Sequence, residues 1–204
     1  YTKSTRGTIL LSKKNLWKGK SFKKLTFGKN AKAGRNNLGR ITSRGKGSGH
    51  KVKYREIDFF RKKDDLKAKV IRIEYDPNRS SHIMLIKYDD EKYSYILAPQ
   101  NIKVDDEVIS GRNKEVKVGN CMPLSDIPFG TNIHNIELNP GGGAKLARSA
   151  GSSAQISGND GMYCILKLAS GEVRKVLRNC RATIGTLSNP DQKNIKLGKA
   201  GRKR

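Results

Sequence analysis

None of the first 55 residues of this 204-residue chain is acidic. Residues 1–63 contain 20 lysines and arginines against 2 acids, residues 64–195 contain 18 against 16, and the last nine residues add 5 cations. A nearly neutral body therefore lies between a long basic arm and a short basic tail. The net charge of +25 predicts a polyanionic partner, although net charge says nothing about fold.

Cysteine is also scarce. Cys121, Cys164 and Cys180 are separated by 43 and 16 residues, which leaves no CxxC pair. An odd number at this spacing fits neither a disulfide framework nor a zinc site. We interpret the three as reduced thiols packed as small apolar residues, which fits a reducing compartment. We expect no metal and no cofactor.

Long apolar runs are missing as well. No run approaches the ~18 residues of a spanning helix, and no secretory signal is recognisable, so we expect no membrane span. The Lys-, Ser- and Thr-rich start is similar in composition to an organelle transit peptide. Because that composition continues far beyond any plausible cleavage point, we interpret it as part of the working protein. No initiator Met is present, which leaves open a segment before Tyr1.

Amphipathic helical periodicity is absent, and short alternating runs begin near Lys67. In AKVIRIEYD, residues 71, 73 and 75 share one face and residues 72, 74 and 76 the other, as in a half-buried strand. Asp-Pro-Asn at 76–78 predicts a turn. Runs of strand length follow: HIMLIKY, YSYILAP, EVISG and EVKVGN. Regular short strands with turn signals predict a small sandwich or barrel.

A second series of strands begins after IPFG with TNIHNIEL. NPGGGAKLARSAG interrupts it, and there LARSA is long enough for one helical turn. Two hairpins follow, AQIS with MYCILKL across Asn159-Asp160-Gly161, and MYCILKL with EVRKVL across Ser170-Gly171. The chain is therefore predicted to be mainly β, with two small β domains in tandem that meet near Pro128.

Motifs for catalysis are missing. Residues 39–46 come nearest to a P-loop, but they have one residue too many between the glycines and no helix follows. GxSxG is absent, and neither His50, His82 nor His134 has a second ligand at metal spacing. His134 and Glu137 are three apart in a strand-like run, which places them on opposite faces. GKAG at 198–201 lacks the helices of a KH loop, and no RRM signature occurs. We predict that the chain is not an enzyme.

The arm repeats glycines and cations between residues 28 and 49. Six glycines, at positions 28, 34, 39, 45, 47 and 49, alternate there with six cations: Lys29, Lys32, Arg35, Arg40, Arg44 and Lys46. Glycine lets a backbone approach closely, and arginine suits phosphate and base edges. Trp17, Phe22 and Phe27 either stack on unpaired bases or pack against protein. We predict that RNA orders this arm, because the segment has no core of its own.

Eight ordered blocks carry a resemblance to a known family. They are GRNNLGRIT, SGHKVKYREIDF, IEYDPNRSSHIMLIKY, YILAP, GNCMPLSDIPFGTNIHNIEL, PGGGAKLARSAG, SGEVRKVLRNCRATIG and GKAGRKR. Over residues 34–204 the chain resembles the large-subunit ribosomal protein two family. That resemblance implies a structural constituent of the large ribosomal subunit that binds its rRNA near the subunit interface and the peptidyl-transferase region, and supports subunit association. The implied partners are large-subunit rRNA, neighbouring ribosomal proteins and small-subunit elements.

The resemblance also implies domains and sites. The domains are a basic rRNA-binding arm at 1–60, an OB-like β-barrel at 61–128, an SH3-like β-barrel at 129–195 and a basic tail at 196–204. The implied RNA contacts are Arg35, Arg40, Arg44, Lys46, His50, Lys51, Arg55, Arg79, Lys145, Arg148, Lys199 and Arg202.

The chain departs from the family pattern at several places. Gly45 replaces a usual histidine, Ser48 interrupts a glycine triplet, and PGGGAK replaces PGKGGQ. The family continues beyond GKAGRKR into a Gly- and His-rich segment, whereas this sequence stops at Arg204. Together with the Lys-, Asn- and Ile-rich composition, the ending leads us to expect an organellar form in the mitochondrial matrix. A plastid or the bacterial cytoplasm is the alternative.

Two other functions follow from the charge. One is an RNA-processing or RNA-modifying enzyme with a basic docking arm, which would use His134. The other is a packaging protein that binds duplex DNA and RNA alike through phosphate contacts, with a strong dependence on salt.

Overall fold

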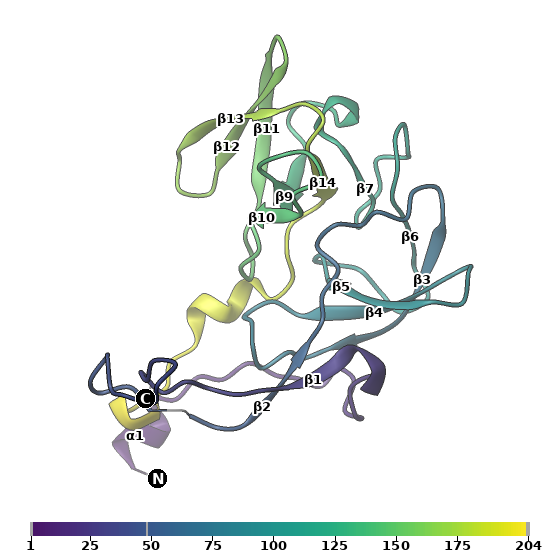
Figure 1. Cartoon of the computed structure of the whole chain (residues 1–204). Helices are drawn as coiled ribbons and strands as arrows, with labels where there is room; N and C mark the ends of the chain where they lie inside the picture. The colour runs from purple at the N-terminus through teal and green to yellow at the C-terminus, as the bar shows by residue number, and fades with distance from the viewer. Residues whose placement is uncertain (1, 48, 203–204) are drawn as a thin grey trace.

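Figure 1 shows the computed structural model, which describes residues 2–47 and 49–202. Tyr1, Ser48 and the last two cations of the expected tail, Lys203 and Arg204, lie outside the described residues. Most regular structure is strand, and α1 (Lys3–Arg6) is the one α-helix of the described ranges. The expected mainly β class is confirmed. No helix in these ranges has the length and apolarity needed to cross a membrane.

Four strands form the first antiparallel sheet, in the order β5-β4-β3-β6. They are β3 (Lys67–Glu74), β4 (Ile83–Tyr88), β5 (Tyr93–Leu97) and β6 (Glu107–Ile109). The expected turn after β3 is present, and the Asn78 N–H donates to Asp76 Oδ1 over 2.9 Å. EVKVGN is not a strand in the structure, because Val116 and Val118 are 48% and 42% exposed and have no core to face.

Both faces of this sheet are covered, which explains the unbroken apolar run in β4. Met84 and Ile86 point into one hydrophobic cluster, with Ile96 of β5. Ile83 and Leu85 point into another, on the opposite face, as expected from the two-residue period of a strand. Phe22, Leu25, Ile57 and Phe59 cover that second face. The segment that leads into the body thus supplies part of its core.

The expected half-buried alternation over residues 71–76 was wrong. The β3–β4 register shifts between Val70 and Arg72, which marks a β-bulge. Beyond it, Tyr75 is 42% exposed while Glu74 and Asp76 are buried at 3% and 0%. Burial of the Glu74 carboxylate is compensated, because Tyr95 Oη donates to Oε1 over 2.8 Å and Arg72 Nε donates over 2.7 Å.

Six strands form the second antiparallel sheet, in the order β13-β12-β11-β8-β14-β7, and β9 pairs with β10. The bounds are β7 (Cys121–Pro123), β8 (Asn132–His134), β9 (Ile136–Glu137), β10 (Ala144–Leu146), β11 (Ala154–Asp160), β12 (Tyr163–Leu168), β13 (Val173–Leu177) and β14 (Arg181–Ile184). Both predicted hairpins are confirmed as β11–β12 and β12–β13. LARSA makes no helical turn, because Leu146 pairs with Ile136 and Ala147 has a φ of 49°.

Backbone pairing and one buried arginine join the two sheets. Pro99 bridges to Leu187, and the Ala144 N–H donates to Phe59 O over 3.0 Å. Arg61, only 3% exposed, donates from Nε to Ser110 Oγ over 2.9 Å. Its carbonyl accepts from Arg181 Nη1 over 2.9 Å. Between described residues, the end strands of neither sheet pair with each other, so closure into barrels stays a prediction, as do the domain bounds.

The arm forms a separate two-stranded ribbon of β1 (Thr26–Lys29) and β2 (Val52–Arg55), seen beneath the first sheet in Figure 1. Among its described residues, none before Ile57 is buried. Hydrogen bonds fix the arm to the first sheet. The Phe22 N–H donates to Tyr95 Oη and the Asp58 N–H donates to Tyr95 O, each over 2.8 Å.

Candidate nucleic-acid interface

The glycine-rich loop between β1 and β2 is held by its own backbone. The amides of Thr42 and Ser43 both donate to Gly34 O, over 3.0 and 3.1 Å. Asn36 Oδ1 accepts from the amides of Leu38 and Arg40 over 3.0 and 2.9 Å. A Cβ at Gly34, which has a φ of 71°, would collide with Ser43 O, so this close approach requires glycine. These bonds give the loop a shape without an apolar core.

Cations of the expected RNA contacts project from this loop. Arg40, Arg44, Lys46, His50 and Lys51 are exposed, and none of the four basic side chains forms an ion pair with a described acidic residue. Arg35 differs, because its Nη1 donates to Lys46 O over 3.3 Å and to Ala33 O. It therefore braces the loop that carries the other cations. Since no carboxylate of the described residues pairs with these cations, the positive field of the loop is available to a polyanion.

Arg55 and Arg79 meet at the buried carboxylate of Asp76. Arg79 Nε donates to Oδ2 over 2.6 Å, and Arg55 Nη1 lies 3.7 Å from Oδ1. The two arginine side chains are 16% and 14% exposed. Asp76 thus fixes both guanidinium groups where the arm joins the first sheet, and the terminal nitrogens of Arg79 make no hydrogen bond to other described residues.

Arg148 joins this group from the second sheet. Its guanidinium lies 4.9 Å from the centroid of the Phe59 ring, and that of Arg79 lies 5.8 Å from the same centroid. Each contact lies within the ~6 Å range of a cation–π interaction. One aromatic ring therefore brings together two of the expected RNA contacts that are far apart in sequence.

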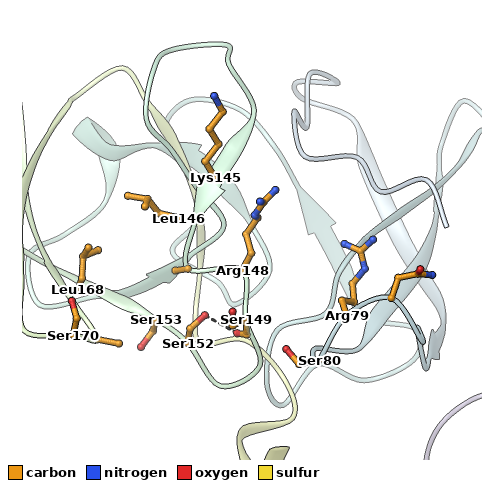
Figure 2. Close-up of a pocket in the computed structure, with 13 residues that line it drawn as sticks. Arg79, Ser80, Lys145, Leu146, Arg148, Ser149, Ser152, Ser153, Leu168 and Ser170 are labelled. Carbon is orange, nitrogen blue, oxygen red and sulfur yellow. Dashed lines mark hydrogen bonds between the residues drawn. The ribbon is translucent and has the colours of Figure 1, made fainter. Parts of the chain in front are cut away.

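A hollow of about 650 Å³ opens beside these arginines. Figure 2 shows Arg79 and Ser80 on one side and Lys145 and Arg148 on the other. The hollow is also lined by four further serines: Ser149, Ser152, Ser153 and Ser170. Among the described residues, no acidic side chain lines it. Three cations with several hydroxyl donors make a site suited to phosphate oxygens.

The expected tail contacts lie against the start of the chain, not against the hollow. Ile9 and Lys196 exchange backbone hydrogen bonds of 2.9 and 3.0 Å. Arg202 Nη1 donates to Thr8 Oγ1 over 2.8 Å, while Lys199 is exposed. The sequence presents arm and tail as opposite ends, whereas the fold places them side by side (Figure 1).

The three arm aromatics divide between the two expected roles. Phe22 packs against the first sheet, with its ring centroid 4.9 Å from that of Tyr93. Trp17 is 49% exposed, but it also contacts protein. The guanidinium of Arg72 lies 4.9 Å from the centroid of the Trp17 ring, and the Trp17 amide donates to Ile73 O over 2.8 Å. Phe27 is 53% exposed and contacts protein through Tyr54 on β2. Packing against protein therefore accounts for Phe22, and Phe27 remains open to a partner.

His134 and the three cysteines are buried in the interior. Burial lowers the pKa of His134 from 6.5 to about 4, and its Nδ1 lies 2.8 Å from Gly185 O. Burial likewise raises the pKa of Cys180 to about 11. Glu137 lies apart from His134 and accepts the amides of Gly143 and Arg181, each over 3.1 Å. The described residues contain no cluster of three or more His, Cys, Asp or Glu side chains that could hold a metal.

Comparison with known proteins places these features in a family. The family model described as "Ribosomal Proteins L2, RNA binding N-terminal domain" matches residues 22–110, and "Ribosomal Proteins L2, C-terminal domain" matches residues 117–204. The chain belongs to the ribosomal protein L2 family. L2 proteins are structural ribosomal proteins, so the chain is not an enzyme and the RNA-modifying alternative is excluded.

Individual relatives agree with the family models. "Large ribosomal subunit protein uL2" of Pelagibacter ubique (strain HTCC1062) is 64% identical over 205 residues, covering 100% of this chain and 73% of that protein. Proteins of the same name from Granulibacter bethesdensis (strain ATCC BAA-1260 / CGDNIH1) and Rickettsia typhi (strain ATCC VR-144 / Wilmington) are 57% and 56% identical. Each match covers 100% of this chain and 74% of the relative.

Within the L2 framework, sequence reasoning missed the residues that position the arginines. Asp76 was expected only in a turn and Phe59 only as an apolar anchor of the arm, yet they hold Arg55, Arg79 and Arg148. Asp76 could have been found from the Asp-Pro-Asn-Arg turn, because an aspartate that starts a turn often bonds to the backbone two residues later. No local signal marks Phe59, since its partners come from distant segments.

Proposed function

We propose that this L2-family chain is a structural constituent of the large ribosomal subunit and binds large-subunit rRNA along two surfaces. One is the exposed cationic loop at 34–51, and the other is the hollow of Arg79, Lys145 and Arg148. The observation that carries the proposal is the second surface: three cations and several serines, with no acid, gathered at the junction of the two sheets. The names of the relatives and of the N-terminal family model support it.

Each surface contributes differently to binding. In the hollow, Asp76 and Phe59 hold the guanidinium groups in place before RNA arrives, so less side-chain freedom is lost on binding. In the loop, the cations make no ion pair with a described acid, so they bind phosphates and release the counterions of the RNA.

The proposed domains remain an arm at 1–60, OB-like and SH3-like barrels at 61–128 and 129–195, and a tail at 196–204. The twelve residues expected to contact RNA remain proposed RNA-binding residues.

The test is sedimentation of the tagged chain from its native cells after a high-salt wash, with and without ribonuclease. We expect it to travel with the large subunit until the RNA is cut. A chain that stays at the top of the gradient, or migrates with DNA, would overturn the proposal and favour packaging.

A matched pair of variants tests the hollow. Arg79→Gln with Arg148→Gln removes two charges at Phe59, and we expect at least a tenfold loss of affinity for an rRNA fragment, since charge-assisted hydrogen bonds contribute about 1.5–3 kcal/mol each. Arg174→Gln is the control, because Arg174 on β13 is exposed and pairs with Glu172 over 3.2 Å. Equal affinities for the double variant and the control would remove the hollow from the interface.

We further propose that the chain supports subunit association and the peptidyl-transferase region, with neighbouring ribosomal proteins and small-subunit elements as partners. The family resemblance supports this role. Ribosomes that contain the Arg79, Arg148 double variant should show fewer joined particles relative to free subunits in a gradient. An unchanged ratio, with the variant present in the subunit, would contradict a role in association.

The ribosome itself is proposed to lie in the mitochondrial matrix or, as the alternative, in a plastid or the bacterial cytoplasm. The relatives named in the comparison are bacterial, which supports the bacterial cytoplasm. Cell fractionation with the tagged chain decides among these compartments, because only one will contain its ribosomes.

A further inference from the structure

A second hollow, of about 250 Å³, lies between the two ends of the chain. Leu10, Leu11 and Lys13 form one side, and Ile195 and Leu197 form the other. The backbone pairing of Ile9 with Lys196 holds these segments together. At Gly198 a Cβ would collide with Ser4 O in α1, so the tail can approach the helix only through glycine. The hollow is therefore built by the fold and is not a gap between loose ends.

Its walls combine flat apolar surfaces with fixed polar groups. The leucines and isoleucine face Tyr75, which also lines the hollow. Asn189 Nδ2 donates to Ser80 O over 2.7 Å and to Gln192 Oε1 over 3.0 Å, which fixes two of the polar side chains. Apolar walls with a few oriented polar groups are typical of sites for small planar ligands.

His82 lines this hollow and also a neighbouring one. Its Nδ1 is buried and has no partner among the described residues. Burial, and then the nearby Lys13 charge, lower the pKa of His82, so the ring is neutral at pH 7. A neutral imidazole offers one donor and one acceptor. Because His82 lines the hollow, its imidazole ring can offer a polar contact to the edge of a ligand there.

Cations stand at the rim of the same hollow. Lys13 Nζ lies 3.5 Å from the centroid of the Tyr75 ring and has no ion pair with a described acid. Arg79 and Ser80 line this hollow and also the larger one described above. A phosphate held by Arg79 would thus lie next to an enclosed space with apolar walls.

We propose that this hollow holds one unpaired nucleotide of large-subunit RNA, with the base between the apolar walls and its edge at His82, and the phosphate at Lys13 and Arg79. The volume lies just below the ~300 Å³ at which pockets for drug-sized ligands begin, which suits a single base. Stacked bases in a duplex cannot enter, so the nucleotide must be unpaired. The inference rests on the proposed function, since it specifies how the same RNA is bound.

The test places a photo-crosslinking amino acid at Leu11, in the wall, and separately at Leu38, which is 71% exposed on the arm loop. Each full-length chain is incorporated into large subunits in its native cells and irradiated, and the crosslinked rRNA nucleotides are mapped. We expect position 11 to crosslink to one nucleotide that is unpaired in the subunit. Position 38 should crosslink to rRNA at other nucleotides.

His82→Phe, combined with the crosslinker at position 11, tests the base edge. The ring keeps its approximate size and loses its hydrogen bond, so we expect the crosslink at that nucleotide to fall about tenfold while the chain still sediments with the subunit. An unchanged yield would overturn the role of His82.

The other outcomes separate the two proposals. Crosslinks from position 11 to protein alone, or to many nucleotides at equal yield, would overturn the nucleotide site, while RNA crosslinks from position 38 would leave the rRNA-binding function intact. If neither chain enters the large subunit, the proposed function fails and the nucleotide site fails with it.

Discussion

The basic arm and the two β-sheets use arginine in opposite ways. In the arm, Arg40 and Arg44 are exposed and make no ion pair with a described acid. Between the sheets, Arg61 is 3% exposed, donates to Ser110 and Gly119, and accepts from Arg181 through its carbonyl. Arg40, Arg44 and Arg61 nevertheless belong to the same basic stretch of the sequence, residues 1–63. Whether a cation is structural or open to RNA thus depends on its partners, not on the local charge density.

The two regions also differ in what holds them in shape. The sheets bury three hydrophobic clusters, whereas no described arm residue before Ile57 is fully buried and only Phe22 and Leu25 pack against one of the clusters. Burial contributes about 25 cal/mol per Å² of apolar surface, so the sheets carry most of the stability. The arm is held instead by backbone hydrogen bonds and by the hydrogen bonds that the Asn36 side chain accepts. Water competes for these exposed bonds. The arm can therefore contribute to binding at little cost to folding.

The largest contrast is expected from equivalent truncations in the two regions. Ile133, 0% exposed on β8, contacts the core of the second sheet, and Ile133→Ala should lower the free energy of unfolding by about 2–5 kcal/mol. Ile41→Ala, at a position 62% exposed in the arm loop, should change it by less than about 0.5 kcal/mol. Urea denaturation measures both, and equal losses would abolish the distinction.

The next largest effect should be a dependence of the free energy of unfolding on pH, caused by the buried His134 of the second sheet. Because burial lowers the pKa of His134 from 6.5 to about 4, the unfolded chain binds a proton in that interval and the folded chain does not. Stability is therefore complete above pH 6.5 and falls as the pH drops toward 4, by about 3 kcal/mol from this residue.

The matched controls are His134→Gln and His50→Gln, measured by urea denaturation over the same pH interval. His134→Gln should flatten the profile, while His50→Gln, which changes an exposed arm histidine, should keep it. A wild-type slope in the His134 variant would show that other groups cause the dependence.

A smaller effect should come from one of the hydrogen bonds that join the arm to the first sheet, the bond between Phe22 and Tyr95. Tyr95 Oη accepts from the Phe22 amide and donates to Glu74, each over 2.8 Å. Tyr95→Phe leaves the Phe22 amide unpaired and leaves Arg72 as the remaining side-chain partner of Glu74, so it should cost about 1–3 kcal/mol and speed hydrogen exchange of the Phe22 amide. Tyr93→Phe is the control, because the Tyr93 hydroxyl makes no hydrogen bond to described residues. Equal exchange rates in the two variants would argue against this anchor.

The smallest effect on stability should follow the loss of arm charge. Arg40→Ala with Arg44→Ala should change the free energy of unfolding by less than about 0.5 kcal/mol. It should nevertheless reduce the salt slope of binding to an rRNA fragment by roughly 0.7 for each lost phosphate contact. Filter binding across a salt series measures the slope, with Arg174→Ala as control. An unchanged slope would mean that these cations do not touch phosphates.

Local chemistry in the sequence was sufficient for several elements. Asp-Gly and Ser-Gly turns between alternating runs predicted β11–β12 and β12–β13, because two or three residues decide where a hairpin turns. The first turn is displaced by one position, to Gly161 and Met162. The alternation in EVKVGN was misleading, since a pattern of period two becomes a strand only where a core and a pairing partner exist.

The sequence by itself determined the segregation of charge, the β class and the absence of cofactor motifs, because these depend on residue types and short spacings. Only the tertiary structure decided that Asp76 and Arg61 are buried, that Arg79 and Arg148 share the Phe59 ring, and that the two chain ends enclose a hollow. A buried charge needs a partner to offset its lost hydration. Here that partner comes from a distant segment, and no local pattern records which segments will meet.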